Sequence, residues 1–240
     1  MATVQKNIRE SLHHLSTPEK ARKQMRYFKT GKNQYGEGDV FLGVKVPDQR
    51  KISKTFYAEC SLQDIDLLLS SKIHELRLTA LFILVLQYQK SKSETQREQI
   101  VSFYLHHTKR INNWDLVDSS AHHILGHYLH NKTDKTVLFK LATSGSLWEE
   151  RIAMISCMYD IKKGEFDTGL EIATILLHNK HDLIHKAVGW MLREIGKIDM
   201  NTEETFLKAH YREMPRTMLR YAIEKFPETK RQAYLNGKIR

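Results

Sequence analysis

Apolar side chains recur at helical spacing along most of the chain. Residues 47–60 place Ile52, Phe56 and Tyr57 on one helical face, and the proline that begins this segment suits the first turn of a helix. Residues 74–90 predict a longer and strongly apolar helix. This pattern predicts helices as the main elements of the fold.

Further helices are predicted at residues 114–129, 147–162, 166–178, 183–196 and 215–226. The run 78–86 is apolar enough for a buried strand, but the sequence offers no second strand to pair with it. Only 4 prolines and 11 glycines interrupt the 240 residues. The fold class that follows is all-α.

Several of the longer helices share a loose repeat, in which a basic residue precedes small and large apolar positions. The pattern occurs in ELRLTALFIL, EERIAMISCM and IHKAVGWMLR, whose basic residues are Arg77, Arg151 and Lys186. Helix pairs repeating every 35–40 residues or so are typical of HEAT-like repeats, which stack into an α–α superhelix. We therefore expect a solenoid with a basic concave face.

The expected organisation is a single HEAT-like repeat domain over residues 1–240. A helical N-terminal part (1–30) leads into a glycine-rich loop (31–46), a repeat array (47–227) and a basic C-terminal tail (228–240). The loop contains GEGDVFLG, which superficially resembles a nucleotide-binding loop. No predicted strand precedes it and no GK[ST] follows, so a connecting loop is the favoured interpretation.

Charge favours a polyanionic partner. The formal net charge is +10, from 38 Lys and Arg against 28 Asp and Glu, and the pI is near 9.5. Such a surplus favours nucleic acid first and an acidic membrane second. Charge alone leaves open a basic housekeeping protein with neither partner.

Basic residues also gather in three parts of the chain, where one run alone would indicate only a solvated surface. The clusters are Arg22, Lys23, Arg26 and Lys29; Lys45, Arg50, Lys51 and Lys54; and Arg216, Arg220, Lys230, Arg231, Lys238 and Arg240. Clusters at the start, middle and end of a curved array predict a surface that follows a polyanion along its length.

Cysteine use and hydropathy indicate a cytoplasmic protein. Cys60 and Cys157 lie far apart without a CxxC motif, which argues against a disulfide framework or a zinc–cysteine cluster. The first ten residues, MATVQKNIRE, lack the apolar core of a signal peptide. The longest apolar run, 78–86, is too short to cross a bilayer. We expect no membrane contact.

Four histidines, His122, His123, His127 and His130, crowd one predicted helix. His123 and His127 have a metal-compatible spacing, but there is no HExxH motif, and no cysteine or carboxylate completes a ligand set. A solvated, partly basic helix face is the favoured interpretation. We expect no metal and assign none of the four a role.

One pair of side chains is unusual for a structural helix. Trp114 and Asp118 lie four residues apart and so share one helical face. A carboxylate beside an indole is costly in a core, and on a surface that faces phosphates the acid would be repelled. Trp148, by contrast, is interpreted as a packing residue at a helix start.

Together, the segments YFKTGK, FLGVKVPDQRK, NNWDLVDSS, WEERIAMIS, HKAVGWMLREIGK and MPRTMLRYAIEKF resemble the bacterial alkylpurine DNA glycosylases of the HEAT-like repeat superfamily. The resemblance covers residues 20–227. It implies hydrolysis of the N-glycosidic bond of N3- and N7-alkylated purines in double-stranded DNA. It also implies a monomer that needs no cofactor and no metal.

The resemblance assigns the site residues by motif. The aspartate and tryptophan of WDLVD are Asp118 and Trp114, the arginine of WEER is Arg151, the tryptophan of AVGW is Trp190, and the tyrosine of RYF is Tyr27. It implies that Asp118 stabilises an oxocarbenium-like sugar and positions water, and that Arg151 holds a phosphate. Further contacts with DNA are expected from Lys186, Arg50, Lys51, Arg216 and Arg220.

Two other functions are alternatives to the enzyme. One is a non-catalytic HEAT-like protein that binds damaged or branched DNA, and the other is a protein-binding solenoid. Asp118 favours the enzyme, because an architectural binder has no evident use for an acid that faces phosphates. The net charge and the basic clusters argue against a protein-binding solenoid.

Overall fold

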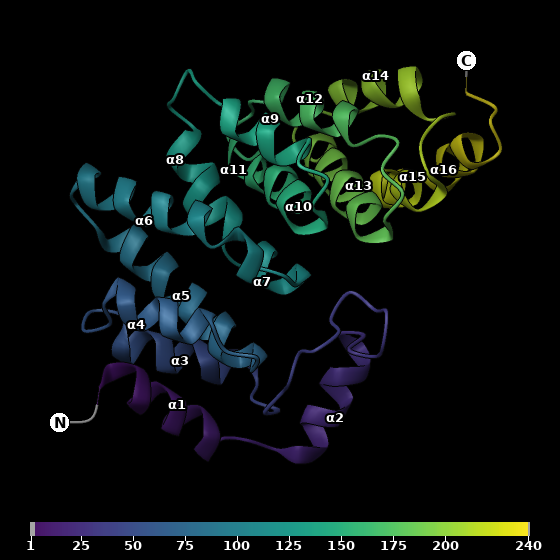
Figure 1. The fold of residues 1–240 in the computed structure, drawn as a ribbon. Coiled ribbons are helices and arrows are strands. Elements are labelled where there is room, and N and C mark those ends of the chain that lie inside the picture. Colours follow the sequence, from purple (N-terminus) through teal and green to yellow (C-terminus); the bar gives the residue numbers. More distant parts are fainter. Residues whose placement is uncertain (1–2, 240) are drawn as a thin grey trace. The chain divides into compact units, whose positions relative to one another are not determined.

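The computed structural model describes residues 3–239 and is built from α-helices (Figure 1). The helices of residues 1–120 are α1 (Val4–His14), α2 (Pro18–Tyr27), α3 (Val46–Phe56), α4 (Leu62–Leu69), α5 (His74–Lys90), α6 (Glu94–His106) and α7 (Trp114–Asp118). Those of residues 121–240 are α8 (His127–Leu129), α9 (Thr136–Ala142), α10 (Leu147–Ser156), α11 (Met158–Ile161), α12 (Asp167–Ile175), α13 (Asp182–Gly196), α14 (Met200–His210), α15 (Arg216–Ala222) and α16 (Glu228–Leu235).

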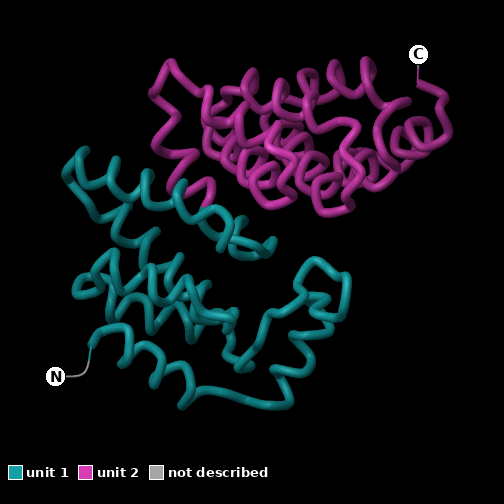
Figure 2. Tube along the Cα trace, viewed as in Figure 1, with its two compact units in different colours: residues 1–120 teal, residues 121–240 magenta. Residues whose placement is uncertain are grey.

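The predicted all-α class is confirmed. Over residues 3–239 the extended backbone forms only an isolated bridge between Val40 and Ile73, and the run 78–86 lies inside α5. The chain divides into two compact units, residues 1–120 and 121–240 (Figure 2). A single repeat domain with a basic concave face stays a prediction.

In the first unit, α5 is the central helix. It contacts α3 and α4, and more lightly α1, α6 and α7. Every residue from His74 to Val85 is buried, so this stretch is enclosed on all sides. A helix that is apolar around most of its circumference belongs in a core. The first turn of α5 departs from this apolar character, because His74, Glu75 and Arg77 are charged or titratable and are nevertheless buried.

In the second unit, α13 has the central place, in contact with α10, α12, α14 and α15. Its apolar residues Ile184, Val188, Met191 and Ile195 recur at helical spacing and are buried. Gly189 lies on the side of α13 that faces α15. A Cβ on Gly189 would overlap the Met218 carbonyl, so glycine permits this close approach.

The prediction of one continuous helix over residues 114–129 is wrong. The first helix, α7, ends at Asp118, and a π-helical turn spans residues 122–126 before α8. The hydroxyl of Ser120 donates to the carbonyl of Leu116 at 2.6 Å, and such a local bond competes with helix continuation. Asp118 therefore stands at the end of a short helix.

Other boundaries also differ from the prediction. The helix predicted for residues 147–162 is divided into α10 and α11, and the one for 166–178 is shortened to α12. The helix predicted for 215–226 is α15 followed by a 3-10 turn, and the segment predicted as a basic tail contains α16, which buries Tyr234. Helices α4, α6, α9 and α14 were not predicted, since their apolar faces are short or mixed with polar residues.

Two helical glycines should respond in opposite ways to alanine. In Gly189→Ala the new methyl group meets the Met218 carbonyl, so we expect a loss of about 1–3 kcal/mol of unfolding free energy. In Gly169→Ala the nearest atom outside the helix is 3.4 Å away, so the better helix propensity should leave stability unchanged or raised. Denaturant melts of both variants test this, and equal losses would contradict it.

Glu203 is a buried acid with an unusual environment. It is 1% exposed in α14, its carboxyl group presses against Gly196, and its Oε1 has no hydrogen-bond partner among the described atoms. Burial, and then the charge of Glu204, raise the pKa of Glu203 from 4.5 to about 8, against the opposing effect of Arg193 and Lys230. The carboxyl group is therefore neutral at pH 7.

This raised pKa should make the protein less stable at alkaline pH. Folded Glu203 keeps its proton up to about pH 8, whereas the unfolded residue loses it near 4.5, so stability falls as the pH rises through this window. The slope is at most about 1.4 kcal/mol per pH unit. Urea melts from pH 5 to pH 6.5, below the range in which His74 contributes, should show a decline that is absent in Glu203→Gln. The exposed Glu171 of α12 provides the control, and a Glu171→Gln variant that also abolishes the decline would refute the assignment.

Candidate functional site

The candidate site is built around α7, and the residue just before this helix is Asn113. Asn113 is fully buried, and its Oδ1 accepts the backbone N–H of Trp114 at 2.8 Å. Asparagine is among the preferred residues before a helix. The same side chain donates from Nδ2 to Asp39 at 3.3 Å, so the start of α7 is attached to the glycine-rich loop.

That loop is fixed by a carboxylate of α5. Glu75 is 1% exposed and accepts the backbone N–H groups of Leu42, Gly43 and Val44 at 2.8–3.3 Å. Gly43 has a φ of +85°, and a Cβ there would overlap the Thr17 carbonyl, so glycine is required. The segment predicted as a connecting loop is therefore held tightly against α5.

A buried ionic network lies beside this loop. Asp39 accepts from the Arg77 guanidinium at 2.7 Å and lies 3.2 Å from Nδ1 of His74. The other ring nitrogen of His74, Nε2, lies 2.8 Å from Asp115 of α7. The side chain of His74 is 2% exposed, and those of Asp39 and Asp115 are 6% and 13% exposed. Two acids and two bases from three segments thus meet at the base of α7.

The network sets the protonation of its members. Burial alone would lower the pKa of His74, but the carboxylate of Asp115, followed by the hydrogen bond to Asp39, raises it to about 9. Arg77 opposes this rise through its like charge. Burial tends to raise the pKa of Asp39, but His74 and Arg77 outweigh it, and the pKa is lowered. At neutral pH the network contains an imidazolium between two carboxylates.

Aromatic rings form a stack above the network. The Trp114 indole lies nearly parallel to Phe28, with centroids 5.2 Å apart and planes at 14°. Phe28 stacks on Phe41 at 5.0 Å, and Phe41 on His74 at 4.6 Å. Tyr27 meets the indole edge-on at 5.9 Å and is itself 66% exposed. Phe28 therefore covers one face of Trp114, while Tyr27 extends into solvent beside it.

Asp118 is the last residue of α7, the short helix that Trp114 begins, and its side chain is half-buried. Burial raises the pKa of the Tyr104 phenol, and the charge of the nearby Asp118 raises it further. The hydroxyls of Tyr104 and Ser120 are hydrogen-bonded at 3.0 Å, which anchors the turn after Asp118. A carboxylate thus stands at a fixed helix end, four residues after an indole.

The second unit contains the other residues predicted for the site. Arg151 of α10 is 4% exposed and donates to the carbonyl of Leu183. Trp190 of α13 is half-buried and donates from Nε1 to Glu194 at 3.0 Å. Lys186 forms an ion pair with Asp182 at 2.7 Å. All three polar groups have partners within their own unit.

The basic residues predicted to contact DNA differ in their surroundings. The Arg50 guanidinium covers the ring of Phe82 at 4.0 Å. Lys51 is exposed, 3.4 Å from Asp48. Arg216 donates to the carbonyl of Leu235 at 2.6 Å and so attaches α15 to the end of α16, and Arg220 of α15 is exposed.

Of the predicted site residues, the structure brings Tyr27 and Trp114 into contact, and Asp118 ends the short helix that Trp114 begins. Arg151, Lys186 and Trp190 belong to the second unit. Sequence analysis missed His74 and Asp39 beneath Trp114. The available signal was the beginning of HELRLTALFILVLQYQK, where titratable residues open an otherwise apolar helix.

Among the described residues, one group of three side chains has the spacing of metal ligands: His130, Asp160 and Glu165. His130 lies 2.8 Å from Asp160, and the Lys135 ammonium group binds the other oxygen of that carboxylate at 2.7 Å. Because a lysine already neutralises Asp160, the group is best described as an ion-pair network between the helices.

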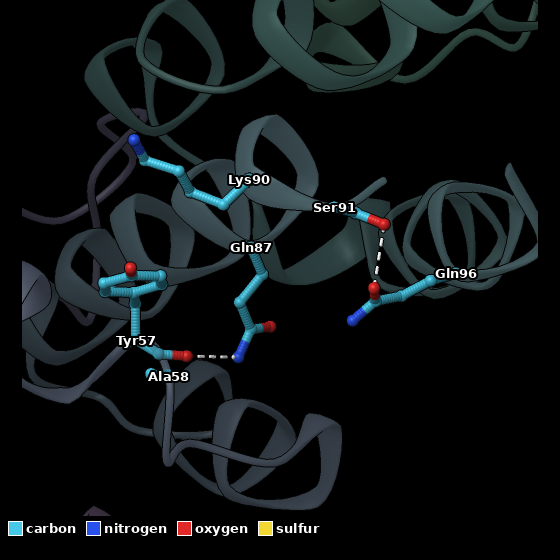
Figure 3. A pocket seen from close by; sticks show the side chains of 6 residues that line it. All are labelled: Tyr57, Ala58, Gln87, Lys90, Ser91 and Gln96. Atoms are coloured by element: carbon cyan, nitrogen blue, oxygen red, sulfur yellow. Dashed lines mark hydrogen bonds between the residues drawn. The ribbon is translucent and has the colours of Figure 1, made fainter. Parts of the chain in front are cut away.

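A polar hollow of about 170 Å³ lies at the other end of α5 (Figure 3). Gln87 and Lys90 line it, and Gln87 donates to the carbonyl of Tyr57 at 2.8 Å. Gln87 follows His74 by 13 residues in the same helix, or about 20 Å at 1.5 Å per residue. The hollow is therefore separate from the site at α7.

The fold and the site thus define an all-α protein in which one short helix carries both a half-buried carboxylate and an indole packed on other aromatic rings. The family model described as "DNA alkylation repair enzyme" matches residues 8–226. The chain belongs to this family, which confirms the resemblance seen in the sequence at the level of the family.

Among solved structures, one described as "Predicted DNA alkylation repair enzyme from Enterococcus faecalis" is similar, with a TM-score of 0.72 and 19% sequence identity. The match covers 89% of this chain and 97% of that one, and at this identity it shows a shared fold. The search of curated proteins found no match. No described helix has the length and apolar character that a membrane span needs.

Removing the charge of Glu75 should release the glycine-rich loop. Glu75→Gln keeps the size of the side chain but replaces a carboxylate that accepts three backbone N–H groups, so we expect a loss of about 1–3 kcal/mol. Hydrogen exchange should accelerate at the amides of residues 42–44. Glu37→Gln is the control, because Glu37 accepts a backbone N–H within the exposed part of the same loop. Unchanged protection of these amides in Glu75→Gln would contradict the clamp.

Proposed function

We propose that this protein is a DNA glycosylase that hydrolyses the N-glycosidic bond of cationic N3- and N7-alkylated purines. The observation that carries the proposal is the Asp118 carboxylate at the end of α7, on the same short helix as Trp114. Membership of the DNA alkylation repair enzyme family supports this chemistry.

The substrate explains why a single carboxylate suffices. Alkylation at N3 or N7 gives the purine a positive charge, so the base leaves without being protonated by the enzyme. As the bond breaks, positive charge develops on the deoxyribose. A carboxylate beside the sugar stabilises that charge and positions the attacking water or accepts its proton. Asp118 has this role in the proposed mechanism.

The aromatic side chains would bind the charged nucleotide. Phe28 and Tyr27 pack against Trp114, which is half-buried, so the exposed part of the indole would contact the nucleotide. Each contact between a cation and an aromatic face contributes about 0.5–2 kcal/mol, depending on desolvation. Tyr27, exposed and edge-on to Trp114, would extend this surface.

The proposal assigns DNA binding to residues of both units. In the second unit, Arg151 would hold a phosphate, Trp190 would contact the nucleotide and Lys186 would add positive charge. The ion pair of Lys186 with Asp182 is partly exposed, and such a pair exchanges for a phosphate at little cost. Arg50, Lys51, Arg216 and Arg220 would contribute charge along the DNA backbone.

The catalytic assignment is tested by Asp118→Asn, which retains the shape of the side chain and removes its charge. We expect single-turnover release of N7-methylguanine from methylated duplex DNA to fall by about 100-fold or more. Folding and affinity for DNA should change little, because the half-buried side chain is not part of the core. The measurement is release of the free base, together with a thermal melt and a binding titration.

Two controls sharpen this test. Asp134→Asn removes an exposed carboxylate and should leave release unchanged. A duplex containing hypoxanthine, an uncharged leaving base, should be a poor substrate for the wild-type protein. If Asp118→Asn releases N7-methylguanine at the wild-type rate, Asp118 is not the catalytic carboxylate. A wild-type protein that binds methylated DNA without releasing base would instead be a non-catalytic DNA-binding relative.

A further inference from the structure

We propose that His74 is a positioning residue: as an imidazolium held between Asp39 and Asp115, it fixes the plane of Trp114 and the orientation of α7. The consequence for catalysis rests on the proposed function, since α7 carries Asp118. The inference about geometry does not, because it concerns contacts within the first unit alone.

Both ring nitrogens of His74 face carboxylates, which requires the ring to be protonated on each. Its Nδ1 lies 3.2 Å from Asp39 and its Nε2 lies 2.8 Å from Asp115. An ionised carboxylate only accepts hydrogen bonds, so both ring nitrogens must donate, and a ring that donates from both is an imidazolium. The charge count agrees, since Asp39 and Asp115 are balanced by His74 and Arg77. A neutral ring would leave a net negative charge in a buried place.

The second step links His74 to α7. Asp115 is the second residue of this helix, and among the described residues His74 is the one side chain that donates a hydrogen bond to its carboxylate. The other oxygen of Asp115 is buried without a partner. Asn113, which precedes the helix, is bound to Asp39. Two hydrogen bonds thus hold the start of α7: Asp115 is bound to His74, and Asn113 is bound to Asp39.

The third step links His74 to the indole plane. The rings of His74, Phe41 and Phe28 contact one another, with centroids 4.6–5.0 Å apart and planes at 20–38°, and Trp114 stacks on Phe28 at 14°. Because His74 contacts Phe28 both directly and through Phe41, its orientation limits the plane of Phe28 and therefore that of Trp114. His74 is locked by hydrogen bonds at both nitrogens, so it gives the stack a fixed base.

The charged groups that face His74 are Asp39 from the loop, Asp115 from α7 and Arg77 from α5. Against the opposing effects of burial and of Arg77, the two carboxylates raise the pKa of His74 from 6.5 to about 9. The stability that protonation adds is complete below about pH 6.5 and is lost as the pH rises through 9. The stack and α7 should therefore loosen in alkaline solution.

The direct test is nuclear magnetic resonance on the intact protein. At pH 7 we expect two slowly exchanging ring N–H signals from His74, with a titration midpoint near 9. In His74→Gln the indole N–H signal of Trp114 should shift or broaden, while the signals of Trp148 and Trp190 stay in place. A single ring N–H at pH 7, or an unchanged Trp114 signal in a folded His74→Gln variant, would overturn the proposal.

His107 is a matched control in the same unit. Its Nε2 lies 2.9 Å from Asp66, its Nδ1 lies 2.7 Å from the carbonyl of Phe103, and its ring stacks on Phe103 at 4.1 Å. His107→Gln therefore removes a hydrogen-bonded, stacked histidine that has no link to α7. It should leave the Trp114 signal and base release unchanged.

The catalytic arm measures single-turnover release of N7-methylguanine. His74→Gln should slow release by about 10- to 100-fold with DNA affinity retained, because small misplacements of reacting groups cost rate rather than binding. If Asp118→Asn is inactive while His74→Gln matches the wild type, the positioning role fails and the proposed function stands. If the wild type releases no base, the proposed function fails, and the resonance experiment still decides the geometry.

Asp115→Asn is a second variant that keeps a hydrogen-bond acceptor for Nε2 but removes the charge. The titration midpoint of His74 should fall below 9, and the alkaline loss of base release should move to lower pH with it. If His74 had only a structural role, the pH at which base release is lost would not follow the titration midpoint of His74. Midpoints that move independently in a variant with unchanged melting would contradict the positioning role, and this variant also serves if His74→Gln does not fold.

Discussion

The first unit depends on the burial of charged side chains at the start of one helix. His74, Glu75 and Arg77 open α5, and each bonds to something outside that helix. Glu75 holds the glycine-rich loop through its backbone, and Arg77 holds the same loop through Asp39. His74 connects the loop to α7. One helical turn therefore fixes two segments that are distant in the sequence and have little regular structure of their own.

Such an arrangement is costly for folding alone. Removing two charges from water is repaid only when the geometry is good, and well-packed apolar residues often give equal or greater stability. A core that required only stability would not need four ionised groups, His74 among them, in one buried network. The network instead fixes one orientation, because each hydrogen bond is directional while apolar contact is not. That property suits a segment that must present Asp118 and Trp114 at defined positions.

The sequence predicted the elements that are set by local periodicity. The long apolar helix, α5, and the amphipathic helix, α13, were found because their apolar residues repeat at helical spacing. Asp118, Trp114 and Tyr27 were predicted as site residues by resemblance, and the structure places them in one unit. The prediction failed at residues 114–129, because the break after Asp118 depends on the hydroxyl of Ser120 and on packing with distant residues. His74 and Asp39 were missed for the same reason: 35 residues separate them, and no local pattern pairs them.

The shortness of α7 is central to the proposed chemistry. A helix of five residues cannot form by itself in water, since nucleation costs more than one turn returns. Its position is therefore determined by its contacts: Asn113 at its start, Asp115 on His74, and Trp114 on Phe28. In the proposed reaction a cationic purine is already a good leaving group, so the protein would have little acid–base work to do and would depend mainly on where the carboxylate stands. Asp118 ends a helix whose beginning is fixed by buried charge, and the same contacts that determine the fold of α7 would determine the placement on which the proposed reaction depends.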